Sequence, residues 1–311
     1  GAVGLMSLFL VDAANLLYIS LLGDPALTAA IGFAATLQFF TISLSIGLSI
    51  AATATVSRAV GQGDWTRARS LGASSAAILV ASLAVAGAGL WVWREEALAL
   101  LGAEGRALEA ASGYLAIVLP SVPLIGVAMV TSGLLRAVGD ARRAMFVTLG
   151  GGVVGAALDP VFIFALDLGV TGAAMAAVLT RVMAAATGLV FAIRVHDLMG
   201  RLSGAAVIGD ARAILAIAGP VVLTQLSTPF GYAYLMAIAA RSGEEVAAGW
   251  AVLSRITPLL FGGIFALSGA VGPILGQNWG AGETGRVLRA FRDATIFAAL
   301  YVGVVWALLR A

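Results

Sequence analysis

Nine apolar stretches dominate the sequence, and each is long enough to cross a lipid bilayer. They cover residues 2–22, 26–56, 71–93, 112–135, 144–166, 171–195, 213–240, 246–275 and 291–309. A helix needs about 20 residues to span the hydrocarbon core, and its backbone groups must pair internally because lipid offers no hydrogen bonds. Continuous apolar stretches favour helices over a membrane β-barrel, whose strands alternate. We therefore predict an all-α membrane protein, a bundle of transmembrane helices.

The composition narrows the functional classes. Hydrophobic residues make up 61% of the 311 and charged residues only 11%, against roughly 25% charged in a soluble domain. The chain has no cysteine, which excludes disulfides and thiolate metal sites. Its single histidine, His196, lies in a polar connector, so we expect no metal site. The net charge of +2, without a concentrated basic face, argues against nucleic acid as a partner.

The placement of the arginines predicts the orientation in the membrane. The connectors after the second, fourth, sixth and eighth stretches carry Arg58, Arg67, Arg69, Arg136, Arg142, Arg143, Arg194, Arg201, Arg212, Arg286, Arg289 and Arg292. The opposite connectors carry few arginines and several glutamates. The positive-inside rule places the arginine-rich connectors and the amino terminus on the cytoplasmic side. We expect the protein to lie in the inner membrane of the cell. An odd number of spans then ends outside, which suggests an incomplete chain.

An internal repeat divides the chain into two parts. Gly61-Gln62 and Gly276-Gln277 lie 215 residues apart, and each closes a long even-numbered stretch before a small polar turn and arginines. Both copies end on the same side, so the repeats are parallel, related by an axis along the membrane normal. The polar connector Arg194–Arg212 separates them. We predict an amino-terminal six-helix lobe over residues 1–200 and an incomplete carboxy-terminal lobe over 201–311, with three of six helices.

Asp159 is the candidate cation site. It lies in the otherwise apolar stretch from Ala144 to Leu166, where an ionised carboxylate costs about 2.5 to 3.5 kcal/mol on insertion scales. Pro160 follows directly and has no N–H, so the helix should bend at the acid. We interpret Asp159 as lining a cavity and binding a proton or a cation. The structural alternative is an acid that caps or pairs to hold a bent helix.

Polar residues in the spans are candidates for a substrate cleft. The second stretch carries a stripe spaced three or four apart, made of Gln38, Thr41, Ser45, Ser49, Thr53 and Ser57. The stripe either lines a cleft or packs tightly against other helices. Arg181 and Arg255 lie inside the sixth and eighth stretches, where each contacts substrate or bonds to backbone carbonyls. Six prolines within the spans either bend helices for transport or are static kinks; they are Pro120, Pro123, Pro220, Pro229, Pro258 and Pro273.

Four segments resemble the multidrug and toxic compound extrusion transporters. They are GLSIAATATVSRAVGQGD (47–64), SGLLRAVGDARRAMF (132–146), LDPVFIFALDLGVTGAAMAAVL (158–179) and GAVGPILGQNWGAG (269–282). The resemblance covers nearly the whole chain. It implies twelve spans in two six-helix lobes, with a cleft that opens alternately to each side. It also implies export of organic, often cationic, compounds in exchange for protons or sodium.

The resemblance carries the acid of the fifth-span Leu-Asp-Pro motif onto Asp159. The chain departs from the family pattern at Gly155 and Ala177, where the family often has asparagine and threonine, and Asn15 stands where the first span usually has an acid. Asp12 lies three residues before Asn15 on nearly the same helical face. We therefore predict one polar cluster of Asp12, Asn15 and Asp159.

The second lobe offers less for a cation. Its first span contains Gln225 but no carboxylate, so we count Gln225 among the cleft candidates and expect no cation site in this part of the chain.

The leading hypothesis is a secondary antiporter that exports drug-like or metabolic organic compounds by alternating access. It needs no cofactor beyond the coupling ion, H⁺ or Na⁺, and its partners are the lipid bilayer and small organic, often cationic, substrates; we expect a monomer. The alternative is a flippase for lipid-linked saccharides of a related fold. A membrane enzyme is a third class, but the sequence has no cluster of His, Cys or acids for acid–base or metal chemistry.

Overall fold

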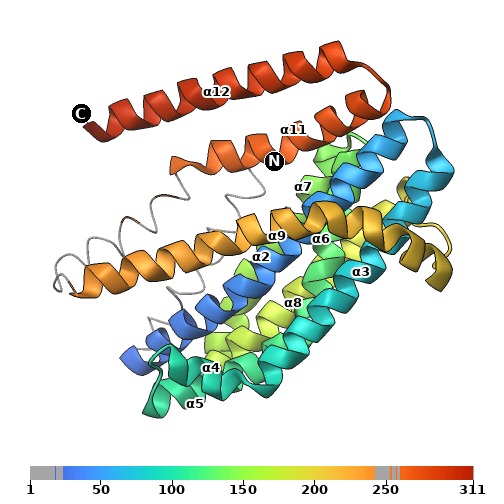
Figure 1. Cartoon of the computed structure of the whole chain (residues 1–311). Helices are drawn as coiled ribbons and strands as arrows, with labels where there is room; N and C mark the ends of the chain where they lie inside the picture. Colours follow the sequence, from blue (N-terminus) through green and yellow to red (C-terminus); the bar gives the residue numbers. More distant parts are fainter. Residues whose placement is uncertain (1–17, 19–23, 242–252, 254–256, 258–259, 311) are drawn as a thin grey trace.

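The computed structural model describes residue 18, residues 24–241, residues 253 and 257, and residues 260–310. Over this part the chain is helical and contains no strand (Figure 1). The long helices are α2 (Pro25–Gly61), α3 (Trp65–Val92), α5 (Gly105–Val118), α6 (Val122–Ala137), α7 (Ala141–Pro160), α8 (Gly169–Leu189), α9 (Gly204–Arg241), α11 (Gly262–Gly280) and α12 (Thr284–Arg310). Shorter elements are α4 (Arg94–Leu100), the 3₁₀ turn η1 (Leu119–Ser121) and the π-helical turns η2 (Val161–Ala165) and η3 (Val190–Val195).

Seven of the nine predicted spans are confirmed as helical segments long and apolar enough to cross a membrane. They are Ala26–Gly61, Trp65–Val92, Gly105–Ala137, Ala141–Ala165, Gly169–Val195, Gly204–Tyr232 and Thr284–Arg310. The predicted span 2–22 lies outside the described residues except for Tyr18, and only the second part of 246–275 is described, as the beginning of α11. The predicted class, an all-α membrane bundle, is therefore correct.

One predicted boundary is wrong. The sequence assigned Arg194–Arg212 to a polar connector, but α9 already begins at Gly204, with the Val207 N–H bonded to the Ser203 carbonyl at 2.9 Å. Polar residues lower the hydropathy of this first part of α9, which therefore resembled a connector. One of them, Asp210, is buried against another helix rather than exposed to solvent.

The helix α2 is the centre of the bundle. It packs against α3, α5 and α6 on one side and against α9 and α11 on the other (Figure 1). The helices approach closely where side chains are small: a Cβ on Gly47 would lie 2.9 Å from the Val222 Cα of α9. Small residues permit such contacts between membrane helices, where lipid gives little hydrophobic drive for association. Through α2, therefore, the two halves of the chain share one packed core.

Prolines change the helix pattern in the fourth span. Pro120 lacks an N–H, so the Ala116 carbonyl has no helical partner, and the Trp91 indole N–H donates to it instead at 3.1 Å. In η1 the Val122 N–H bonds to Leu119, which also releases the Val118 carbonyl. The hydroxyl of Ser121, in the same segment, donates to the Val118 carbonyl at 2.7 Å, so side chains from this segment and from α3 supply the bonds that the broken helix lost.

The turn between α6 and α7 is fixed by a left-handed glycine and an acidic cap. Gly139 has φ +87°, and Asp140 then accepts the Arg143 N–H at 2.9 Å as the N-cap of α7. The same carboxylate lies 2.8 Å from His196 Nε2, which joins the ends of α7 and η3. Burial acts to raise the pKa of Asp140, but the bonds from Arg143 and His196 outweigh burial and lower the pKa to about 2.

Replacing Asp140 tests this cap. We expect Asp140→Ala to lower the free energy of unfolding by about 1 to 2 kcal/mol, since a cap and an ion pair are lost, and Asp140→Asn to lose less because asparagine also caps. Because the folded pKa lies below the unfolded one, the stabilisation is complete above about pH 4 and is lost as the pH falls towards 2. Thermal unfolding in detergent at pH 7 and at pH 3 measures it. Asp293→Ala, at an exposed acid, is the control, and equal melting temperatures for the two alanine variants would contradict the assignment.

Candidate functional site

Asp159 is a buried carboxylate close to one end of its span. Its exposed fraction is 3%, and it lies six residues before the end of the Ala141–Ala165 span, on the side away from the arginine-rich connectors. Gly155 precedes it by one turn and is buried, and α7 packs against α8. The acid is thus a buried titratable group on a helix that packs closely against α8.

The backbone at Asp159 departs from regular α-helix. Pro160 cannot bond to the Ala156 carbonyl, the Val161 N–H bonds to the Leu158 carbonyl, and a π-helical turn follows. The structure therefore has a change of hydrogen-bond pattern at the acid, and the predicted bend stays a prediction. The turn is itself hydrogen-bonded, with the Leu166 N–H donating to the Val161 carbonyl at 2.9 Å, so the backbone at the acid is irregular but ordered.

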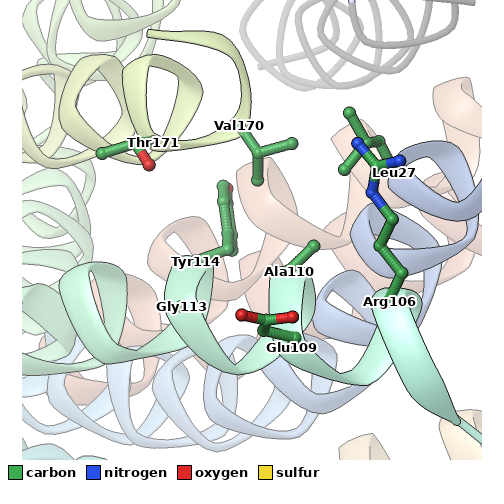
Figure 2. A pocket seen from close by; sticks show the side chains of 8 residues that line it. All are labelled: Leu27, Arg106, Glu109, Ala110, Gly113, Tyr114, Val170 and Thr171. Atoms are coloured by element: carbon green, nitrogen blue, oxygen red, sulfur yellow. The ribbon is translucent and has the colours of Figure 1, made fainter. Parts of the chain in front are cut away.

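A cavity of about 470 Å³ opens on the same side of the bundle, between the beginnings of α2, α5 and α8. It is lined by Leu27, Arg106, Glu109, Ala110, Gly113, Tyr114, Val170 and Thr171. Figure 2 shows Ala110 and Tyr114 pointing from α5 towards Val170 and Thr171 of α8. The next residue, Gly172, packs against η2, where a Cβ would lie 2.4 Å from the Phe162 carbonyl oxygen, so the cavity lies at the level of the turn that follows Asp159.

Two of the predicted cleft residues, Gln38 and Arg181, are in contact. Arg181 of α8 donates to the Gln38 amide oxygen, to the Val118 carbonyl at 2.9 Å and to the Ser121 hydroxyl at 2.8 Å. Gln38 has an exposed fraction of 9%. Arg181 therefore joins α2, η1 and α8, and it supplies a donor to the carbonyl that the proline break released. The sequence left open whether Arg181 contacts substrate or backbone, and the backbone contact is present.

The rest of the polar stripe faces neighbouring helices. Thr41 and Ser45 are buried, with Thr41 Oγ1 bonded to its own helix at the Gln38 carbonyl, 2.8 Å away. Ser49 donates to the Met129 carbonyl of α6 at 2.8 Å. Ser45 Oγ has no hydrogen-bond partner within the described residues. The stripe is thus covered in this state, and its role in a cleft stays a prediction.

The remaining predicted site residues are not brought to Asp159 by the described structure. Asp12, Asn15 and Arg255 lie outside the described residues, so the predicted cluster with Asp159 stays a prediction. Gln225 is half-buried on α9. Within the described part of the chain, no group of His, Cys, Asp or Glu has the arrangement of a metal site.

Sequence reasoning missed Asp210. Its exposed fraction is 2%, and Arg67, Ser70 and Ser74 of α3 bond to its two oxygens. The sequence assigned it to the connector Arg194–Arg212. An earlier start of the seventh span, at Gly204, would have placed this acid on a helix.

Comparison with known proteins identifies the family. The family model MatE matches residues 2–161 and 220–310. A solved Vibrio cholerae MATE transporter, a mutant form of VcmN, is 27% identical with a TM-score of 0.88, over 96% of this chain and 68% of that one. A structure of MATE in complex with MaD5 is 26% identical with a TM-score of 0.90, over 99% of this chain and 70% of that one.

Two curated relatives carry functional names. The FAD transporter of Shewanella oneidensis is 29% identical over 300 residues, which are 93% of this chain and 65% of that protein. The multidrug export protein MepA of Staphylococcus aureus (strain MW2) is 28% identical over 60% of this chain and 41% of that protein. The chain thus spans about two thirds of the length of the first relative.

The helical bundle, with seven helices long and apolar enough to cross a membrane in its described part, defines a multi-pass membrane protein whose solved neighbours are MATE structures. The family match extends over most of the sequence, and the chain belongs to the MatE family of multidrug and toxic compound extrusion transporters.

The contacts of Arg181 predict a structural effect. Arg181→Met removes the charged donor from Val118 and Ser121, and hydrogen bonds of charged groups contribute about 1.5 to 3 kcal/mol. We expect a clearly lower melting temperature in detergent. Arg181→Lys should have an intermediate melting temperature, because one ammonium group cannot reproduce the donor geometry of the planar guanidinium. Arg201→Met, at an exposed arginine, is the matched control. Equal melting temperatures for the two methionine variants would show that the donor is dispensable.

Proposed function

We propose that the protein is a secondary active antiporter, which exports drug-like or metabolic organic compounds in exchange for protons or sodium by alternating access. The observation that carries the proposal is the buried carboxylate of Asp159 at the break between α7 and η2, within a MatE-family fold. Intramembrane acids are costly unless they have a partner or a task.

The coupling follows from the cost of the charge. Binding of a proton or a sodium ion neutralises Asp159, a buried carboxylate at the break between α7 and η2, and lowers the cost of keeping this group inside the span. The α7 helix then packs differently against α8, and the irregular turn after Pro160 absorbs the change. Movement of one charge along the field supplies about 2.3 kcal/mol per 100 mV, enough to drive modest accumulation.

The two ends of the bundle have different parts in the cycle. We assign the arginine-rich end to the cytoplasm by the positive-inside rule. The cavity lined by Arg106, Glu109 and Thr171 then opens to the outside. It lies at the end of the bundle nearer to Asp159, so we take it as the entrance for the coupling ion.

The names of the relatives guide the choice of substrate. One is a FAD transporter and another a multidrug export protein, so both a metabolic compound and a drug-like compound are candidate substrates. A fluorescent organic cation and FAD are the two probes to try first.

Transport into or out of proteoliposomes tests the proposal. We expect wild-type protein at its full natural length to transport at least one probe when a proton or sodium gradient is imposed. Asp159→Asn should lower the gradient-driven rate tenfold or more, while its melting temperature stays near that of the wild type. Asp293→Asn, at an exposed acid on α12, should leave transport unchanged.

Retained gradient-driven transport by a folded Asp159→Asn variant would contradict the role of the acid. A wild type that moves neither probe under any gradient, but translocates saccharide lipid headgroups, would replace the antiporter with a flippase.

A further inference from the structure

Two sets of contacts join the halves of the chain at the arginine-rich end of the bundle. One set joins α3 to α9 and the other joins α2 and α6 to α11 (Figure 1). Neither set belongs to the cation site, since both lie at the opposite end of the helices from Asp159.

The first set is centred on Asp210 of α9. Its Oδ2 accepts the Ser74 hydroxyl at 2.7 Å and the Ser70 hydroxyl at 3.2 Å, and its Oδ1 accepts the Arg67 guanidinium. Asp210 is buried, whereas Arg67 is half-exposed. All three of these donors come from α3, so the charge of Asp210 is satisfied by the other half of the chain.

The second set brings the two copies of the Gly-Gln motif together. A Cβ on Gly61 would lie 2.0 Å from the Gln277 carbonyl oxygen, and a Cβ on Gly276 would lie 2.0 Å from Ser57 Oγ. The side-chain amide of Gln277 donates to the Ala137 carbonyl at the end of α6, at 2.7 Å. The ends of α2 and α11 are therefore in backbone contact, with no room for a methyl group.

We propose that Asp210, Arg67, Ser70 and Ser74 form a latch between the two lobes, which holds the arginine-rich end closed. The glycine contact at Gly61 and Gly276 is the surface that closes with it. Opening this end requires the buried carboxylate to leave three donors on α3 together, so the latch sets how often that end opens. The latch rests on the alternating access proposed above.

The physical reason lies in the three hydrogen bonds that the carboxylate accepts. Hydrogen bonds to a charged group are net stabilising relative to the same group in water, so together they favour the closed state. In the closed state Asp210 depends on α3, and in an open state it depends on water. Removal of the carboxylate takes away the advantage of the closed state without touching the cation site.

The chain contains no cysteine, so two introduced cysteines report the opening without background labelling. Thr66→Cys beside the latch and Ala281→Cys after α11 are both at exposed positions. Spin labels at the two sites give the distribution of distances across the arginine-rich end in liposomes, and no substrate is needed.

We expect a mostly short distance for the labelled parent. Asp210→Ala should raise the ratio of long to short distances at least tenfold, and Gly276→Ala should do the same by steric clash. Arg67→Gln should raise this ratio by less. The double variant Asp210→Asn, Arg67→Gln should give the same ratio as Asp210→Asn alone, because the two residues act as one unit. Asp293→Ala should leave the distribution unchanged.

An unchanged distribution in a folded Asp210→Ala variant overturns the latch. Additive effects of Arg67→Gln and Asp210→Asn also overturn it, and this pair serves if the alanine variant does not fold. The distances are independent of transport. If Asp210→Ala opens the arginine-rich end but the parent transports nothing, the latch stands and the antiporter proposal fails.

Discussion

The structure depends on one constraint: a backbone carbonyl within a membrane-spanning segment needs a hydrogen-bond donor from the protein itself. Regular helices meet this requirement for most of the chain. Where prolines break the fourth span, Trp91 and Arg181 reach from other helices to the released carbonyls of Ala116 and Val118. Two large side chains are thereby fixed in place, and Arg181 in turn fixes Gln38 of the central helix. A local defect thus orders the contacts of three helices.

Close packing is the second contribution. In lipid, helices gain little from burying apolar surface against one another, so they associate through small residues and polar contacts. The contacts of Gly47 with α9 and of Gly61 with α11 show this for the helix that both halves share. The same helix carries the polar stripe, so its hydroxyls either bond to the backbone, as in Thr41 and Ser49, or lie covered, as in Ser45.

The sequence predicted the fold well because membrane helices are encoded locally. Length and apolar composition were sufficient for seven spans, and the Leu-Asp-Pro motif marked the irregular backbone at Asp159. Long-range contacts were not predictable in the same way. Gln38 and Arg181 are both polar residues in apolar helices, but no local pattern says that they meet. Asp210 was assigned to a connector because polar residues lower the hydropathy of a helix end, whichever way they face.

The meeting of the two Gly-Gln motifs has a consequence for how such a chain can arise. Residues 57–61 of α2 lie against residues 276–280 of α11, and these segments are copies of one motif in the predicted parallel repeat. A half-sized ancestor with that motif would form the same contact with a second copy of itself, across a twofold axis along the membrane normal. Fusion of the two copies preserves the interface of such a homodimer. It also frees each side to change alone: Ser57 and Arg58 of α2 contact glycines of α11, where the two copies of the motif already differ.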